Sequence, residues 1–165
     1  MNQNSFKTIS EGHNKRWLSP KIGIPAQFGG GIDFLDDFFA IELKGGNKSY
    51  HDSFAVHSYQ IGGFKRAYPG REFFWAFLLY DTTKPICDMT ESENIAKFMV
   101  DRDVWFLEWD WIRQFPVHYA PTGPYVYPKK KDFPADNYFR KIKVQGGRLY
   151  VPNDSSLDWK LGVKL

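Results

Sequence analysis

Residues 71–81, REFFWAFLLYD, are the segment that most restricts how this chain can fold. The apolar run inside it, FFWAFLLY, is continuous, so a strand formed here would be apolar on both faces. Strands of this kind lie in the middle of a sheet that is covered on both sides. Other elements of the chain must therefore supply two covers, and the sequence predicts a mixed α/β fold.

The rest of the chain supplies candidates for those covers. Helices are expected around residues 5–18 and over 49–67, with loops at Pro20 and at the triple glycine 29–31. Between them, a strand hairpin is expected to turn at Asp36-Asp37. The strands of this hairpin are expected at 31–35 and 38–44, and the hairpin ends at 45–47. A further strand is expected from 103 and turns into helix by 112. Loop is expected after 116, followed by a terminal hairpin of 138–144 and 147–152.

The composition is that of one globular domain, residues 1–165, with a basic segment rich in Tyr, Pro and Lys at 117–165. The chain is 42% hydrophobic and 18% aromatic, with a net charge of +3. Residues 81–110 carry eight Asp/Glu against three Lys/Arg, whereas residues 121–165 carry nine Lys/Arg against four Asp/Glu. A basic end of this kind can hold phosphates.

Composition also argues against several classes of protein. No apolar run approaches the roughly 20 residues that cross a membrane, and the polar N-terminus lacks the apolar region of a signal peptide. Cys87 is the single cysteine, which excludes an internal disulfide and favours a reducing compartment. We therefore expect no membrane association and a cytoplasmic location.

One strand carries charges where an apolar strand should not. In FFAIELK, residues 38–44, Glu42 and Lys44 project to the same face. If the hairpin forms, Asp33 approaches Glu42, and the two carboxylates with the Leu43 carbonyl make an oxygen-rich cage. Such a cage suits Mg²⁺, for which Mn²⁺ can substitute, and Lys44 beside it could orient a water. These are the parts required to hydrolyse a phosphodiester.

Asp33 followed by Glu42-x-Lys44 resembles the active-site motif of the PD-(D/E)xK nuclease superfamily. Ile32 stands where that motif usually has proline. The resemblance implies a restriction-endonuclease-like core, in which a helix precedes a three-stranded meander, a second helix and a further strand. It also implies that Glu11, on the first helix, completes the catalytic set.

A narrower resemblance covers residues 31–143 and is to RecU-type Holliday-junction resolvases. It rests on KSYHDSFAVHSYQIGGF, FFWAFLLYD, DVWFLEWDWIRQF and KDFPADNYFRKI, taken in order. It implies a nucleoid-associated DNA endonuclease, prokaryotic or phage-encoded, that leaves a 5′-phosphate, with Gln60 in the catalytic set. Because a junction or a duplex needs two cuts, we expect a homodimer. The projecting stalk of those proteins has no room between Pro20 and Gly30. The residues expected to contact DNA are Lys48, His57, Lys129, Lys130, Lys131 and Arg140.

Other interpretations of the same residues remain open. The Tyr/Pro/Lys segment could read bases in a groove, as in a type II restriction endonuclease. If Glu42 and Lys44 form only an ion pair, the chain is a nucleic-acid-binding protein without catalysis, or an aromatic-rich carbohydrate-binding module. Asp36 and Asp37 suit a turn better than a metal, and the tryptophans at 105, 109 and 111 suit a core.

Overall fold

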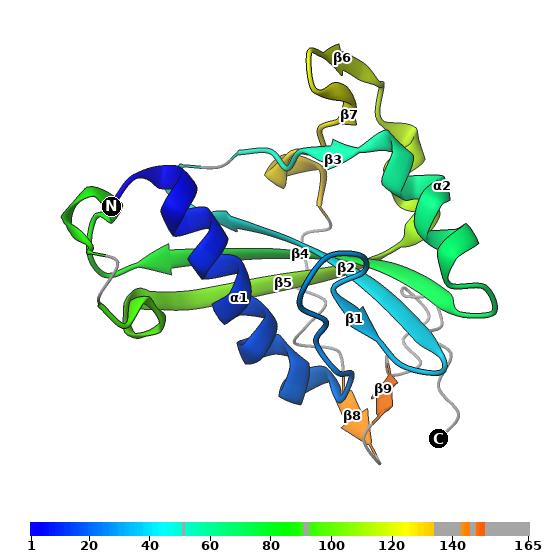
Figure 1. Ribbon diagram of the computed structural model, residues 1–165, viewed down its shortest axis with the longest axis horizontal. Helices are drawn as coiled ribbons and strands as arrows, with labels where there is room; N and C mark the ends of the chain where they lie inside the picture. The colour runs from blue at the N-terminus through cyan, green and yellow to red at the C-terminus, as the bar shows by residue number, and fades with distance from the viewer. Residues whose placement is uncertain (51, 91–92, 134–142, 146–147, 151–165) are drawn as a thin grey trace.

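The computed structural model describes residues 1–50, 52–90, 93–133, 143–145 and 148–150, the last two stretches by their backbone alone. Its elements follow in chain order (Figure 1): α1 Gln3–Ile22, β1 Phe34–Leu35, β2 Phe39–Asn47, β3 Val56–His57, α2 Ser58–Ala67, β4 Glu72–Thr82, β5 Met99–Glu108, β6 His118–Ala120, β7 Gly123–Val126, β8 Lys143–Gln145 and β9 Arg148–Tyr150. Short 3₁₀ helices η1 Ile86–Asp88, η2 Ile95–Phe98, η3 Trp109–Gln114 and η4 Lys130–Asp132 lie between strands.

The main sheet has the strand order β1-β2-β4-β5, so the apolar strand β4 is central, as its sequence predicts. β2 runs parallel to β4 and places Glu42 opposite Trp75, whereas β4 and β5 are antiparallel. A parallel pair needs a crossover connection, and α2 lies within the connection from β2 to β4. The mixed α/β class with a mixed sheet is therefore confirmed.

The two faces of β4 belong to two different cores. Phe74, Ala76, Leu78 and Tyr80 pack with apolar residues of α1, whereas the alternating residues Phe73, Trp75, Phe77 and Leu79 pack with α2 and the β3–β7 region. On the second face Trp75 and Trp109 stack with ring centroids 4.0 Å apart, and Trp105 is also buried. The prediction that these tryptophans are core residues is confirmed for 105 and 109.

α1 begins where Asn2 accepts a hydrogen bond from the Ser5 N–H and ends at Gly23, whose φ is +70°. The prediction of a loop at Pro20 is wrong, because Pro20 lies inside the last turn of this helix. The prediction that Gly45 and Gly46 end the hairpin strand is also wrong. β2 continues through them, and a Cβ on Gly45 would lie 3.2 Å from Asn14 Nδ2, so the glycine allows α1 to pass close to β2.

Two further predictions need correction. The helix expected over 49–67 begins only at Ser58, because residues 53–57 form a bridge and β3 beside the strand β7. The segment after Pro116 is not simply loop: β6 and β7 pair as a hairpin and form a second sheet of order β3-β7-β6 (Figure 1). The terminal hairpin is confirmed where the structure describes it, in the antiparallel pairing of β8 with β9. Among the described helices, none is long and apolar enough to cross a membrane.

Candidate active site

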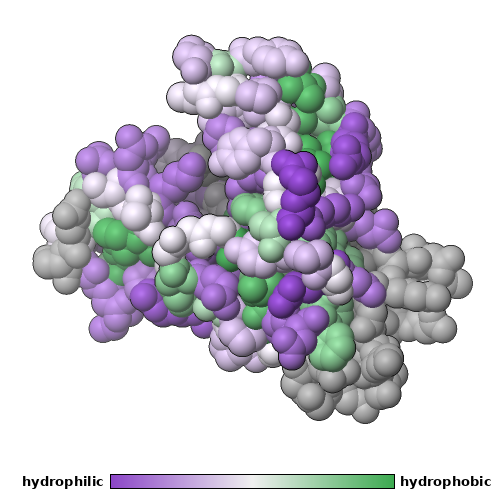
Figure 2. Space-filling model, turned by 45° about the vertical axis from the view of Figure 1, so that its right-hand side comes forward, coloured by the Kyte–Doolittle hydropathy of each residue, from purple (hydrophilic) through white to green (hydrophobic). Residues whose placement is uncertain are grey.

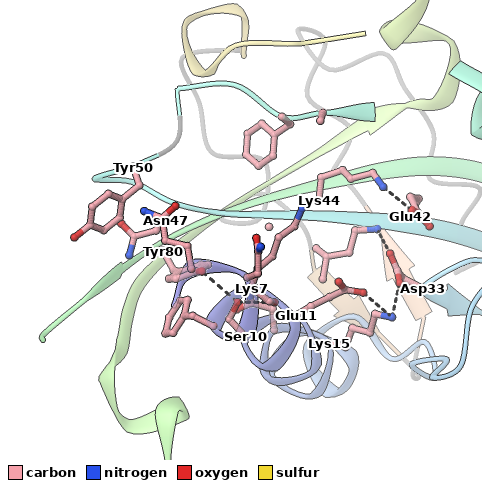
Figure 3. Close-up of a pocket in the computed structure, with 18 of the residues that line it drawn as sticks. Lys7, Ser10, Glu11, Lys15, Asp33, Glu42, Lys44, Asn47, Tyr50 and Tyr80 are labelled. Atoms are coloured by element: carbon pink, nitrogen blue, oxygen red, sulfur yellow. Dashed lines mark hydrogen bonds and ion pairs between the residues drawn. The ribbon is translucent and has the colours of Figure 1, made fainter. Parts of the chain in front are cut away.

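The short strand β1 leaves part of β2 uncovered, and a polar cavity opens there. β1 pairs with β2 through Phe34↔Ile41 and Leu35↔Ala40, and among the described residues no strand pairs with this edge of β2 beyond Ile41. A cavity of about 740 Å³ lies next to the exposed edge. Its walls come from α1, the loop Gly29–Gly31, β2, the segment 53–55 and α2 (Figure 3).

The Asp33 side chain contacts the edge of β2 beyond the end of its pairing with β1. The preceding glycines all have positive φ, and a Cβ on Gly31 would lie 2.7 Å from the Tyr68 hydroxyl, so this turn requires glycine. Asp33 Oδ2 then accepts a hydrogen bond of 2.7 Å from the Leu43 N–H. In a strand the N–H and C=O of one residue point to the same edge, so the Leu43 carbonyl also faces this side.

Glu42 projects from β2 into the cavity and is 4% exposed. Its Oε1 accepts hydrogen bonds from Lys44 Nζ at 2.8 Å and from Gln60 Nε2 at 3.0 Å. Its Oε2 is buried and has no hydrogen-bond partner among the described residues. Burial raises the pKa of Glu42 to about 8, Lys44 opposes that rise, and the nearby Asp33 carboxylate adds to it.

Lys15 links the acids that come from different elements. Its Nζ lies 2.5 Å from Asp33 Oδ1 and 3.3 Å from Glu11 Oε1, and it donates to the Gln27 carbonyl at 3.2 Å. Figure 3 shows the Lys15 ammonium between the two carboxylates. Burial alone would lower the pKa of Lys15, but the bonds to Asp33 and Glu11 outweigh it and leave that pKa raised. The Lys15 ammonium therefore stabilises the position of the Asp33 carboxylate.

The donor set fits a hard divalent cation that keeps some of its own water. Asp33, Glu42 and the Leu43 carbonyl offer oxygen ligands on one edge, and the orphaned Oε2 is a buried acceptor in need of a cation or a proton. Within the described part of the chain, no group of three or more His, Cys, Asp or Glu side chains is arranged to hold a metal. A site with so few protein ligands suits Mg²⁺ completed by water and substrate phosphate.

Comparison of the sequence with models of known protein families and with curated proteins gave no match.

The structure brings the predicted catalytic residues to one cavity. Asp33, Glu42, Lys44, Glu11 and Gln60 all line it, as does Leu43. They come from the loop before β1, from β2, from α1 and from α2, so their proximity depends on the tertiary fold. Asp36, the competing acid, instead accepts hydrogen bonds from the Phe38 and Phe39 N–H groups, which confirms its role in the turn.

The residues expected to contact DNA are scattered. Lys48 lies outside the cavity and forms ion pairs with Asp103 at 2.9 Å and Asp81 at 3.7 Å. His57 is not on the helix but precedes it, at the end of β3. The three lysines at 129–131 are exposed and follow the second sheet. Arg140 lies outside the described residues.

Lys15 is the site residue that the sequence did not reveal. A signal existed: Glu11 and Lys15 are spaced i, i+4, which places both on one side of a helix, and Lys15 lies within the polar stretch of α1. The ion pair with Asp33 is not visible in the sequence, because it depends on how α1 crosses β2.

Proposed function

We propose that this protein is a Mg²⁺-dependent DNA endonuclease that hydrolyses phosphodiester bonds in branched DNA. The observation that carries the proposal is that Asp33, Glu42 and Lys44 line one cavity beside β2, where one buried oxygen of Glu42 has no partner in the part of the chain that the structure describes. A solvated ion pair on an edge strand would not need this burial. A structural pair would normally satisfy both oxygens of the carboxylate.

Each residue of the site has a separate proposed role. Asp33, Glu42 and the Leu43 carbonyl would hold the metal, and Mn²⁺ would serve in place of Mg²⁺. The bound ion would lower the pKa of a water and neutralise charge on the phosphate oxygens. Lys44, whose ammonium reaches the same carboxylate, would orient the attacking water and stabilise the transition state.

Two neighbours set the geometry of this group. Gln60 fixes the Oε1 side of Glu42 through its 3.0 Å hydrogen bond, which leaves Oε2 free for a ligand. Glu11, 3.3 Å from Lys15, is the third carboxylate within reach of the cavity.

The order of elements supports the restriction-endonuclease-like core. A helix, an isolated antiparallel bridge between Ala26 and Phe34, the strands β1 and β2, the helix α2 and the parallel strand β4 follow one another. That order corresponds to helix, meander, helix and strand, with the first strand of the meander reduced to a single bridge. Asp33 immediately precedes the second member of the meander, β1, and Glu42 lies on the third, β2.

We further propose that the enzyme works as a homodimer, since resolving a junction or cutting a duplex takes two strand scissions. Each cut would leave a 5′-phosphate. Discrete fragments from linear duplex would instead identify a type II restriction endonuclease.

The deciding experiment is cleavage of a supercoiled plasmid, a four-way junction and a linear duplex, each with Mg²⁺ and with EDTA. We expect Mg²⁺-dependent cleavage that is lost in Glu42→Ala and Lys44→Ala. Glu108→Ala and Lys97→Ala are matched controls, since both side chains are exposed and neither lines the cavity. They should cleave as the wild type does.

The rival is a non-catalytic nucleic-acid-binding protein. It is favoured by the observation that Lys44 and Lys15 already neutralise Glu42 and Asp33 inside the chain. DNA binding that Glu42→Ala does not affect, with no cleavage in Mg²⁺ or in Mn²⁺, would establish the non-catalytic function and refute the nuclease function.

A further inference from the structure

The small sheet β3-β7-β6 carries a row of aromatic rings that leads to the candidate active site. His57 on β3 and His118 on β6 both lie opposite Tyr125 on β7, so the three share one face of the sheet. Tyr127 lies two residues on and faces the same way. The intervening Val126 and its partner Val56 are buried in the core. These rings therefore lie on the face of the sheet opposite Val126.

The rings of this row are in contact from end to end. Centroids are separated by 4.8 Å from Tyr59 to His57, 3.9 Å from His57 to Tyr125, and 5.9 Å from Tyr125 to Tyr127. His118 lies 5.6 Å from Tyr127. Tyr59 is 63% exposed, and the others of the row are exposed or half-buried. We call these five residues the aromatic row.

The aromatic row is joined to the cavity and to positive charge. Tyr127 lines the cavity that contains Glu42 and Lys44. The exposed lysines at 129–131 follow it after Pro128, and Lys129 is bridged to Ser53, another residue of the cavity wall. The hairpin β6–β7 belongs to the lobe at the top of Figure 2, and a hollow separates this lobe from the left-hand part of the surface.

Each of these features matches one part of a single-stranded nucleic acid. Exposed aromatic rings stack on bases of any sequence, and lysines contact the backbone phosphates. In a paired duplex the bases are stacked on one another and cannot reach such rings. Phosphates alone would account for the lysines but not for the rings.

We propose that the aromatic row binds unpaired bases of a DNA strand, and that the substrate of the candidate active site has a single-stranded segment beside the phosphate to be cut. This inference rests on the proposed nuclease function for its second part and narrows the substrate class from branched DNA to flaps, splayed ends and gapped branches. The strand would run over Tyr125 and Tyr127 toward Glu42, with its phosphates near Lys129 to Lys131.

The test compares two strands of equal charge in EDTA, where no metal-dependent cleavage occurs. One is an oligothymidylate of about 16 nucleotides, within the range that a stacking site can cover; the other is an abasic strand of the same length. By fluorescence anisotropy we expect the wild type to bind the oligothymidylate at least tenfold more tightly. Equal affinity for the two strands would overturn the proposal.

Variants separate stacking from charge. Tyr127→Ala and Tyr125→Ala should each weaken oligothymidylate binding about tenfold and leave abasic binding unchanged. Tyr119→Ala is the matched control, because Tyr119 is 87% exposed on the same hairpin but pairs with Pro124 and so faces away from the aromatic row. Lys130→Ala should weaken the binding of both strands equally and reduce the salt dependence of their affinity. If Tyr127→Ala lowers only stability, the row is a structural cross-strand cluster and the proposal fails.

A measurement on the wild type alone covers the case of a variant that does not fold. An oligonucleotide carrying 5-iododeoxyuridine should photocrosslink to the peptide that contains Tyr125 and Tyr127; crosslinks elsewhere would contradict the proposal. All binding arms contain EDTA, so base-dependent binding without any cleavage in Mg²⁺ would refute the nuclease function and leave the stacking site standing.

Discussion

Replacing Glu42 by glutamine should make the metal-free protein more stable at alkaline pH while abolishing cleavage. The Glu42 carboxylate is buried, and one of its oxygens has no partner among the described residues; its pKa in the folded state is about 8, against 4.5 for a solvent-exposed glutamate. Glutamine has nearly the same shape and carries no charge. It can still accept from Lys44, and its amide can donate to Gln60 Oε1, which is also buried without a partner among the described residues.

The sign and size follow from proton linkage. Between pH 4.5 and 8 the folded state binds the Glu42 proton and the unfolded state does not, so the free energy of unfolding falls as pH rises through this window. At about 1.4 kcal/mol per pH unit, the interval from 4.5 to 8 corresponds to about 5 kcal/mol at most. Glu42→Gln lacks this loss, so the difference between the two proteins should be small near pH 5 and reach a few kcal/mol at pH 9.

Urea denaturation in EDTA at pH 5, 7 and 9 measures this difference. Glu108→Gln serves as the control, because Glu108 is exposed and should leave the pH dependence of the wild type unchanged. Adding Mg²⁺ at pH 9 should restore stability to the wild type and much less to Glu42→Gln. Parallel pH profiles for wild type and Glu42→Gln would refute the reasoning, since they would mean that Glu42 is ionised without cost.

Three further outcomes are expected. Lys15→Met removes the ammonium beside Asp33, so its melting temperature in EDTA, measured by thermal shift, should be lower than that of the wild type. Mn²⁺ should raise the melting temperature of this variant more than that of the wild type. An equal rise in both proteins would contradict the role given to Lys15. Asp36→Ala removes two hydrogen bonds to the turn and should cost about 1–2 kcal/mol by urea denaturation, with cleavage per folded molecule unchanged, because Asp36 does not line the cavity. Trp109→Ala should cost about 3–5 kcal/mol by the same measurement, because it empties a buried stack on Trp75; a loss below about 1 kcal/mol would mean that this core is not packed as described.

The sequence predicted the central strand and the common face of Glu42 and Lys44 more reliably than the ends of the elements. The unbroken apolar run at 73–80 dictated burial on both faces, whatever lay around it. The alternation of side chains along a strand predicted that Glu42 and Lys44 share one face, and Asp36 predicted the turn of the hairpin. These are local rules, and each was enough by itself.

What the sequence could not supply depends on contacts between distant segments. Gly45 and Gly46 look like a strand end, but they remain in β2 because α1 passes beside them. Residues 53–57 have helical spacing, yet Phe54 and Val56 pack in the core beside β7 instead. The ion pair of Lys15 with Asp33 likewise arises from the crossing of α1 over β2.

The most direct test of the metal site is the anomalous scattering of Mn²⁺ in crystals of the protein grown with MnCl₂ near pH 8. The account predicts a peak about 2.1 Å from Glu42 Oε2 and from an oxygen of Asp33, with the Leu43 carbonyl beside it. A map with no peak at these two carboxylates, at Mn²⁺ concentrations that support cleavage of DNA, would contradict it.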